Sequence, residues 1–275
     1  MKRIWMGVVV VLMAQVAFGA LQYEFVQTSR SDSDGLPAMD LSAKAVIDGS
    51  RSRVDFLSGN AYPPGTYVIA TDGARKLKFV DPTQKTYTEV NTLTIASAIG
   101  MSNIKVENLK SSVTKLDDQP IIAGIPTDHY RLSLTFDITV VFNARALRRT
   151  IRTEIDKWTT VRFGNIADEV SKTLQTGNIE IDNLIAAETT KIAGFPLKQS
   201  IRVTAVYSAP KGPVKSKLSI PNTTTLTREM TVTAIREARV EDAFFAIPAG
   251  YNRADFAERV PKPQTQVLSL EPSSK

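Results

Sequence analysis

The chain contains no cysteine among its 275 residues and only one histidine, His129. Without cysteine there can be no disulfide bridge, no thiolate chemistry and no lipidated N-terminal cysteine. A protein zinc site needs several histidine or cysteine ligands, and this sequence cannot provide them. A glycine-rich phosphate loop and the Gly-x-Ser-x-Gly motif of serine hydrolases are also missing. We therefore expect neither a metal ion nor another cofactor.

Long apolar runs are missing too, except at the N-terminus. Residues 1–20 read MKRIWMGVVVVLMAQVAFGA, with two basic residues first, an apolar centre, and small residues at the end. This order predicts a signal peptide cleaved after Gly19, with Ala20 as the alternative. An uncleaved anchor helix is the other interpretation, but the apolar centre is short for a span of about 20 residues. We expect residues 1–19 to be removed and the mature protein to be periplasmic.

A strong excess of one charge is absent as well. The chain has 34 basic and 28 acidic residues, a formal net charge of +6, and loss of Lys2 and Arg3 with the signal peptide leaves +4. These charges are spread along the chain, so we expect no nucleic acid partner. No linker-like composition interrupts residues 20–251, which predicts a single domain and, most simply, a monomer. Residues 252–275 contain three prolines and no apolar period, which predicts a flexible tail.

Short alternating runs separated by turn signals fill most of the predicted domain. Asp-Gly pairs at 48–49 and 72–73, and the segment 81–84, each lie between two such runs, which is typical of β-hairpins. The predicted strands are 21–30, 39–49, 52–56, three strands within 66–90, 104–116, 127–142, 147–161, 179–188, 198–207 and 225–237. The expected fold class is mainly β (α+β), with an antiparallel meander and few helices.

Two segments predict helices. Residues 165–177 read NIADEVSKTLQTG, with an asparagine cap at the start and a closing glycine at the end. Ile166, Val170 and Leu174 then form one apolar stripe along this helix. Residues 92–100, TLTIASAIG, predict a shorter helix. The stripe needs an apolar partner, and the apolar face of the sheet is the obvious one.

The sequence Ile-Ala-Gly-x-Pro occurs twice, at 122–126 and at 192–196, each time before a long predicted strand. Gly124 and Gly194 are the repeated glycines. We interpret both segments as tight turns that lead into one sheet, with proline where its missing N–H is tolerated.

The segment from Tyr130 to Phe142, YRLSLTFDITVVF, alternates so regularly that one face of the strand is entirely apolar. At about 3.3 Å per residue this strand is roughly 40 Å long. Its apolar face carries Tyr130, Leu132, Leu134, Phe136, Ile138, Val140 and Phe142. Either the protein's own core or a bound molecule must cover such a long stripe.

Residues that could support catalysis are few. His129 lies beside Asp128 at the start of the long strand, without a nucleophile motif, so we interpret it as structural or solvent-facing and expect it to be dispensable. The segment 32–35, DSDG, resembles part of a calcium loop but lacks the closing glutamate, which favours a polar loop. The adjacent acids at 117–118 and 241–242 point to opposite sides of a strand, so neither pair forms a ready acid/base dyad.

The segment 145–158, RALRRTIRTEIDKW, is the most basic part of the chain. In a strand, Leu147, Ile151 and Ile155 share one face. The other face carries Arg148, Arg152, Glu154 and Asp156. Two interpretations stay open: a solvated, charge-balanced surface, or contact with an anionic partner such as lipid headgroups or an acidic protein.

Three segments resemble an exported bacterial family of unknown function that is distantly similar to the LolA/LolB-type periplasmic lipoprotein carriers. They are GTYVIATDGARKLKFVDPTQKTYTEV (65–90), IAGIPTDHYRL (122–132) and FFAIPAGYNR (244–253). The resemblance implies a strongly curved antiparallel sheet, an unclosed half-barrel, with a few helices over its concave side. In the carriers this space holds acyl chains. The middle segment departs from the family at residues 127–129, where a cysteine or lysine pair is usual, and no functional residue is carried over.

The sequence is compatible with two functions. The first is a non-enzymatic carrier that holds a lipid or acyl chain on the concave face, lined by the stripe and by Ile166, Val170 and Leu174, with transient contact to a membrane surface. The second is a structural or interaction protein of the cell envelope, with an envelope protein as partner, whose concave face is filled by its own side chains. A packed interior leaves few voids, whereas a ligand site needs roughly 300–1,000 Å³.

Overall fold

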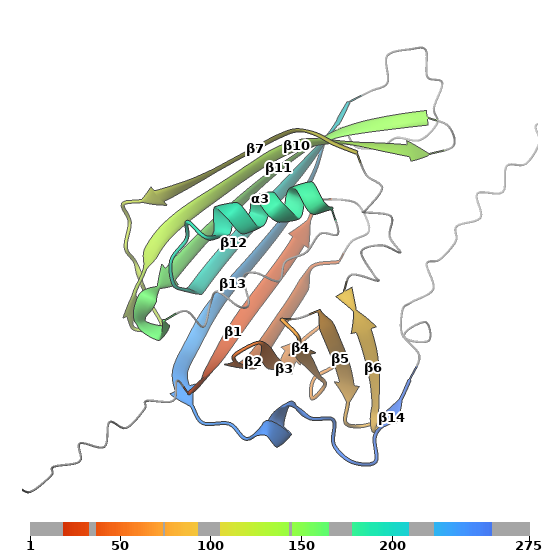
Figure 1. Cartoon of the computed structure of the whole chain (residues 1–275), viewed down its shortest axis with the longest axis vertical. Coiled ribbons are helices and arrows are strands. Elements are labelled where there is room, and N and C mark those ends of the chain that lie inside the picture. Colours follow the sequence, from red (N-terminus) through yellow and green to blue (C-terminus); the bar gives the residue numbers. More distant parts are fainter. Residues whose placement is uncertain are drawn as a thin grey trace, which may run out of the picture.

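The computed structural model describes residues 19–32, 37–73, 75–92, 105–142, 145–164, 178–208 and 223–254. Within them, one 12-stranded sheet runs in the order β14-β6-β5-β4-β3-β2-β1-β13-β12-β11-β10-β7, and helix α3 lies over one of its faces (Figure 1). The edge strands β14 and β7 do not pair with each other, so the sheet of the described residues is open. This confirms the predicted fold class: mainly β, with a curved, unclosed antiparallel sheet.

The first six strands form an antiparallel meander. They are β1 (Ala20–Ser31), β2 (Met39–Asp48), β3 (Arg51–Gly59), β4 (Tyr67–Thr71), β5 (Lys76–Asp81) and β6 (Thr86–Asn91). The predicted turns join β2 to β3, β4 to β5 and β5 to β6. In the last of these, the Asp81 carboxylate accepts hydrogen bonds from the backbone N–H groups of Thr83 and Gln84, which stabilises the turn.

The second half of the sheet consists of longer strands. They are β7 (Lys105–Leu116), β10 (Asp128–Phe142), β11 (Arg145–Thr160), β12 (Phe195–Ser208) and β13 (Thr223–Ala238). A small separate hairpin, β8 (Ile121–Ile122) with β9 (Ile125–Pro126), and the short 3-10 helix η2 (Val161–Phe163) lie between them. β1 pairs with β13 from Ala20↔Ala238 to Ser31↔Leu226, and this pairing joins the two halves.

Both repeated Gly-x-Pro segments contain a glycine with positive φ. Gly124, at φ 75°, lies in the turn between β8 and β9, and Gly194, at φ 89°, immediately precedes β12. A Cβ at Gly194 would lie 2.5 Å from the Thr160 carbonyl oxygen, whereas a Cβ at Gly124 would meet nothing within 4 Å. The repeated motif is therefore a turn in both places, and only Gly194 is also required by close packing.

Bulges interrupt the strand pairing at several places and favour the bending of the sheet. At the bulge between β10 and β7, Asn108 adopts φ 54° and donates a hydrogen bond to the Asp137 carboxylate, at 2.7 Å. The same carboxylate accepts hydrogen bonds from Arg148 and Thr150 of β11, both at 2.6 Å. Asp137 thus connects β7, β10 and β11.

Helix α3 (Ile179–Thr189) occupies the segment that the sequence analysis predicted as the strand 179–188, so that prediction is wrong. The Asn178 side chain accepts hydrogen bonds from the backbone N–H groups of Glu180 and Ile181, and acidic residues in the first turn suit the positive end of the helix. The apolar residues recur at Ile181, Leu184 and Ile185, which is helical spacing. The alternation at the start of the segment was misleading.

The two helices predicted at 92–100 and 165–177 lie outside the described residues, apart from Thr92. The predicted signal peptide lies outside them too, except for Gly19. No helix among the described residues is long and apolar enough to cross a membrane.

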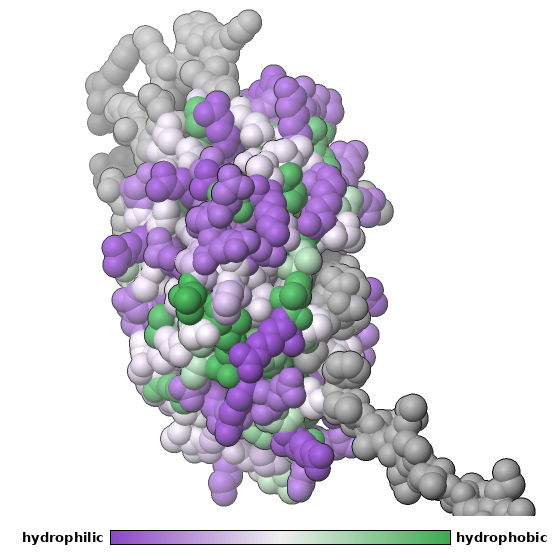
Figure 2. Space-filling view, turned by 90° about the vertical axis from the view of Figure 1, so that its left-hand side faces the viewer, coloured by the Kyte–Doolittle hydropathy of each residue, from purple (hydrophilic) through white to green (hydrophobic). Residues whose placement is uncertain are grey.

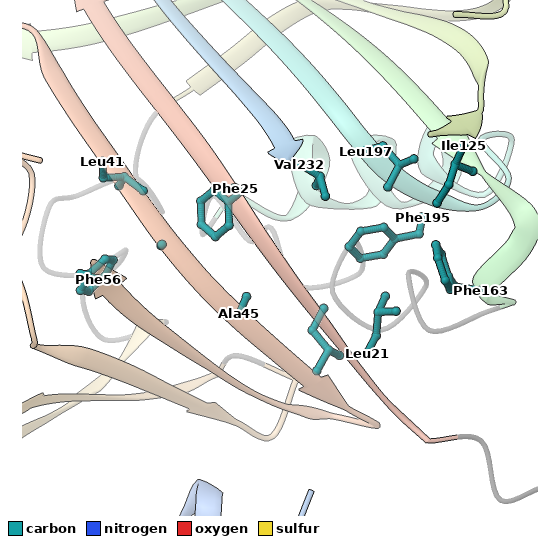
Figure 3. Close-up of a cluster of buried hydrophobic side chains, with 12 residues drawn as sticks. Leu21, Phe25, Leu41, Ala45, Phe56, Ile125, Phe163, Phe195, Leu197 and Val232 are labelled. Atoms are coloured by element: carbon teal, nitrogen blue, oxygen red, sulfur yellow. The ribbon is translucent and has the colours of Figure 1, made fainter. Parts of the chain in front are cut away.

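The largest buried cluster lies on the face of the sheet that α3 covers, which we call the concave face (Figure 3). It brings together residues from the middle strands, the β8–β9 hairpin and η2. Its buried members are Leu21, Phe25, Leu41, Ala43, Ala45, Ile47, Phe56, Ile125, Phe163, Phe195, Leu197 and Val232. Each fully buried large side chain stabilises the fold by about 1.5–3 kcal/mol, so this cluster anchors both halves.

The opposite, convex face of the first half is covered by the segment that follows β13. This segment contains the 3-10 helix η3 (Asp242–Phe245) and β14 (Asn252–Arg253), which pairs in parallel with β6. Phe245 is buried against residues of β1, β2, β4 and β5, and we call this group the convex cluster. β14 belongs to the segment that was predicted as a tail from residue 252, so ordered structure extends beyond that boundary.

The edge strand β7 is polar. Lys105, Lys110 and Glu107 lie on it, and Lys105 forms an ion pair with Glu107 at 2.7 Å. The side of the molecule at the left of Figure 1 is mostly hydrophilic, with hydrophobic residues gathered near its middle (Figure 2). Charged side chains on an edge strand discourage pairing with another chain.

Candidate functional site

The concave face of β10, β11 and β12 is a set of rows in which side chains from neighbouring strands lie opposite one another. Paired residues in a sheet point to the same face, so the register shows which side chains are neighbours. Four successive rows are Leu132–Ile155–Ile201, Leu134–Thr153–Val203, Phe136–Ile151–Ala205 and Ile138–Arg149–Tyr207. The predicted stripe of β10 therefore continues across two further strands.

The first half of the predicted stripe is filled by the protein itself. Tyr130, Leu132 and Leu134 are 8%, 1% and 5% exposed and form a buried cluster with Ile192, which we call the α3 cluster. Leu184 and Ile185 of α3 pack against this cluster. The cover predicted for the stripe thus exists, but among the described residues it is provided by α3.

The second half of the stripe differs. Phe136 and Ile138 are only half-buried and belong to none of the buried clusters of the described residues. Val140 and Phe142 lie in β10, but their side chains are not among those that the structure describes. Ile166, Val170 and Leu174, predicted to cover the stripe, fall in the segment 165–177 outside the described residues.

We call the half-buried apolar residues next to the α3 cluster the open patch. They share the concave face of three neighbouring strands and are not members of a described buried cluster. The open patch consists of Phe136, Ile138, Ile151, Ile201, Val203 and Ala205. Apolar side chains in this state offer a surface for another apolar molecule.

One hydrogen bond ties α3 to the sheet, and an ion pair within the α3 segment supports it. Glu188 is 6% exposed and accepts a hydrogen bond from Ser111 of β7 at 2.8 Å. The Lys191 ammonium donates to both carboxylate oxygens of Glu188, at 2.9 Å each. The hydrogen bonds from Lys191 and Ser111 hold the pKa of Glu188 below its usual value. The helix is thereby held over the α3 cluster.

Lys157 is a buried cation on the concave face. It is 7% exposed, lies opposite Tyr130 and Gln199, and has no hydrogen-bond or ion-pair partner among the described residues. Burial lowers the pKa of its ammonium group. Lys157 is not among the candidate site residues predicted from the sequence. The alternation that puts Ile151 and Ile155 on one face of β11 also puts Lys157 there, so the signal was present.

His129 lies on the convex face, away from the stripe. Its Nδ1 is 2.6 Å from an Asp118 carboxylate oxygen and its Nε2 is 3.1 Å from an Asp156 oxygen. The ring stacks on Trp158 at 4.2 Å between centroids, and Arg131 also bonds to Asp156. The hydrogen bond from His129 holds the pKa of Asp118 below its usual value.

Both ring nitrogens of His129 are thus occupied by carboxylates, and no described hydroxyl group bonds to the ring. A nucleophilic triad needs a histidine that bonds to a nucleophile on one side. The arrangement fits the structural interpretation of His129, because it links β10, β11 and the Asp118 segment. Among the described residues no group of three or more His, Asp or Glu side chains could hold a metal ion.

The basic segment 145–158 divides between the two faces. Arg148 and Asp156 lie on the convex face and form ion pairs with Asp137 and Arg131, respectively. Arg149 lies on the concave face, over the Tyr207 ring at 5.4 Å. The charge-balanced interpretation therefore describes the convex face, whereas Arg149 and Lys157 are cations on the concave one.

No family model matches the chain, and no curated protein matches its sequence. Among solved structures, the chain is similar to a LolA superfamily protein from Nitrosomonas europaea, with 12% sequence identity and a TM-score of 0.31. The alignment covers 84% of this chain and 91% of that one. A match at this TM-score carries no functional information for this chain.

Proposed function

We propose that the chain is a non-enzymatic, periplasmic binding or carrier protein that holds a lipid or another hydrophobic ligand on the concave face of its sheet. The open patch carries this proposal, because it presents half-buried apolar side chains on three neighbouring strands outside the described buried clusters. A curved sheet with such a face can bury an apolar molecule without rearranging its strands.

The site proposed here is narrower than the whole predicted stripe. Tyr130, Leu132 and Leu134 already pack against Ile192 and α3, so they support the wall of the site. Ligand contact is proposed for the open patch and for the stripe residues beyond it, Val140 and Phe142. Ile166, Val170 and Leu174 are proposed as further contacts, from the amphipathic pattern of their segment.

One observation favours the second function, a structural or interaction protein of the cell envelope. The α3 cluster shows that part of the concave face is filled by the chain's own side chains. If the remaining part were filled in the same way, no ligand would fit, and the face would serve as an ordinary core.

The two functions differ in what the purified protein contains. We expect native mass spectrometry of protein purified from the periplasm to show a bound mass that organic extraction removes and identifies as lipid. After extraction, the protein should bind Nile red, a neutral apolar dye, with a saturable increase in fluorescence. A protein that carries no ligand and binds no dye would exclude the carrier function and favour the structural one.

A further inference from the structure

We propose that Lys157 binds the anionic headgroup of an amphipathic ligand whose acyl chain lies along the open patch. The headgroup chemistry is a carboxylate or a phosphate monoester. This inference rests on the proposed function and adds to it a ligand class and a polar contact.

The burial of Lys157 is the first reason. Only 7% of the residue is exposed, and among the described residues no carboxylate or carbonyl group bonds to its ammonium group. A buried cation without a partner destabilises a fold, because the ammonium loses its hydration and receives nothing in return. An anion from a ligand would supply the missing partner.

The neighbours of Lys157 are the second reason. The row through Lys157 contains Tyr130 of β10 and Gln199 of β12, and opposite residues in a sheet have Cβ atoms about 5 Å apart. Among the described residues, neither the Tyr130 hydroxyl nor the Gln199 amide has a hydrogen-bond partner. An ammonium, a hydroxyl and an amide from three adjacent strands can all donate to one anionic group.

The distribution of charge over the concave face is the third reason. Between the rows of Tyr130 and Ile138, the concave positions of β10, β11, β12, β13 and β1 include no acidic residue. The same positions include three cations: Arg149, Lys157 and Arg228. Acidic residues of these strands occupy the alternate positions and therefore lie on the convex face, as do Asp137, Glu154 and Glu229.

Two carboxylates outside these rows, one on α3 and one at the start of β10, are already paired. Glu188 of α3 bonds to Lys191 and Ser111, and Asp128, at the start of β10, bonds to Lys115. Neither is therefore free to neutralise Lys157. A face whose cations have no carboxylate partner among the described residues, and which also carries apolar side chains, is complementary to an anionic amphiphile.

The length of the concave face along β11 also matches a long acyl chain. Lys157 and Arg149 are eight residues apart on β11, which is roughly 26 Å at about 3.3 Å per residue. Ile151 of the open patch lies between them on the same face, and Ile155, which packs against the α3 cluster, lies closer to Lys157. A ligand with its headgroup at Lys157 would lay its chain along these residues, towards Arg149.

The test compares ligands that share one chain and differ in the headgroup. Nile red bound to the extracted protein is displaced with dodecanoate, dodecyl phosphate or dodecanol. We expect wild type to bind at least one of the two anionic ligands about tenfold or more tightly than dodecanol, as expected for a hydrogen-bonded ion pair. The stronger of the two anions distinguishes a carboxylate from a phosphate headgroup.

The variant Lys157→Met keeps most of the side-chain volume and removes the charge. We expect it to bind dodecanol as wild type does, to lose the tenfold preference for the anion, and to melt at the same or a higher temperature. The control is Lys115→Met, because Lys115 lies in the same row but is half-exposed and paired with Asp128. It should keep the preference.

Several results would overturn the inference. Wild type that binds dodecanol and the anions equally, or Lys157→Met that keeps the preference, would show that Lys157 takes no headgroup, with the carrier function intact. If Lys157→Met does not fold, the same displacement experiment is done with Lys157→Gln, and the preference of wild type for the anions over dodecanol still tests the inference. Wild type that binds neither the dye nor any of the three ligands would exclude the proposed function itself and this inference with it.

Discussion

Asp137 is 9% exposed and accepts hydrogen bonds from Asn108, Arg148 and Thr150, which come from the two strands that flank β10. These three bonds, Thr150 first, stabilise the ionised carboxylate and lower the pKa of Asp137 to about 2. A carboxylate whose pKa is depressed in the folded state stabilises the fold at any pH above its unfolded value of about 3.8. This contribution is lost as the pH falls from about 4 towards 2.

We predict that Asp137→Asn lowers the free energy of unfolding by about 2 kcal/mol at pH 7, because it removes charge-assisted hydrogen bonds. The difference from wild type should shrink between pH 4 and pH 2, since wild-type Asp137 becomes protonated there. Urea denaturation at a series of pH values measures both effects. Glu107→Gln is the control, because among the described residues Glu107 pairs with exposed Lys105 alone, so the substitution should change the stability little. A constant difference down to pH 2 would contradict this account of Asp137.

At the same scale, the two repeated glycines make a matched pair. We predict that Gly194→Ala destabilises the fold by about 2 kcal/mol or more, because the new Cβ would meet the Thr160 carbonyl group at positive φ. Gly124→Ala should cost only about 1 kcal/mol, since it has the backbone strain without the contact. Thermal melts of the two variants provide the comparison, and equal losses would show that the close approach to Thr160 is unimportant.

At the scale of the elements, most strands could be predicted because their signals are local. The alternation of the β10 stripe, and the turns at Asp48–Gly49 and Asp81–Gln84, each lie within a few residues of the chain. The curved, open form of the sheet was suggested only by the family resemblance. The bulges that favour this curvature, such as the one opposite Phe136, leave no clear pattern in the local sequence.

Other features could not be predicted, because they depend on contacts between distant segments. Residues 179–188 alternate weakly, and packing of Leu184 and Ile185 on the β10 stripe adds to the local signals of the Asn178 cap and the acidic first turn. The candidate site likewise has one feature that the sequence predicts and one that it does not. The stripe was visible in the sequence, but its division into the α3 cluster and the open patch depends on where α3 lies.

The stripe of β10 provides the prediction at this scale. We predict that Phe136→Glu leaves a folded protein that no longer binds Nile red or co-purifies with lipid, because a carboxylate on the half-buried open patch can still be hydrated. Leu132→Glu is the contrast: Leu132 is 1% exposed in the α3 cluster, so an unpaired carboxylate there should cost several kcal/mol and prevent folding. Thermal melts and dye titration of both variants decide.

If Phe136→Glu fails to fold as Leu132→Glu does, and wild type never binds the dye, the stripe is ordinary core along its whole length. That result would favour the structural function. A folded Phe136→Glu that still binds dye would place the ligand elsewhere on the molecule.

At the scale of the whole molecule, the segment after β13 holds the first half of the sheet from its convex side. Arg53 lies over the rings of Tyr67 and Phe244 and donates a hydrogen bond to the Phe244 carbonyl oxygen. Phe245 is 7% exposed in the convex cluster. The convex face of the first half is therefore covered by residues of its own chain.

We predict that Phe245→Ala lowers the free energy of unfolding by about 3 kcal/mol, because it leaves a cavity in the convex cluster. Dye binding on the concave face should be unchanged in the folded variant, since the two clusters lie on opposite faces. Urea denaturation and Nile red titration measure the two quantities. A variant of unchanged stability would show that the segment does not anchor the sheet.

The pairing of β1 with β13 joins the first strand of the sheet to its last long strand, from Ala20↔Ala238 onwards. During synthesis or secretion β1 emerges near the beginning and β13 near the end. The middle of the sheet, where these two strands pair, is therefore the last part that can form. Contacts between such distant segments slow folding. For a chain that is exported as proposed, the delay would keep it unfolded until its last strand has crossed the membrane. In a refolding experiment with pulsed hydrogen exchange, the amides shared by β1 and β13 should become protected after those of the β4–β5 hairpin.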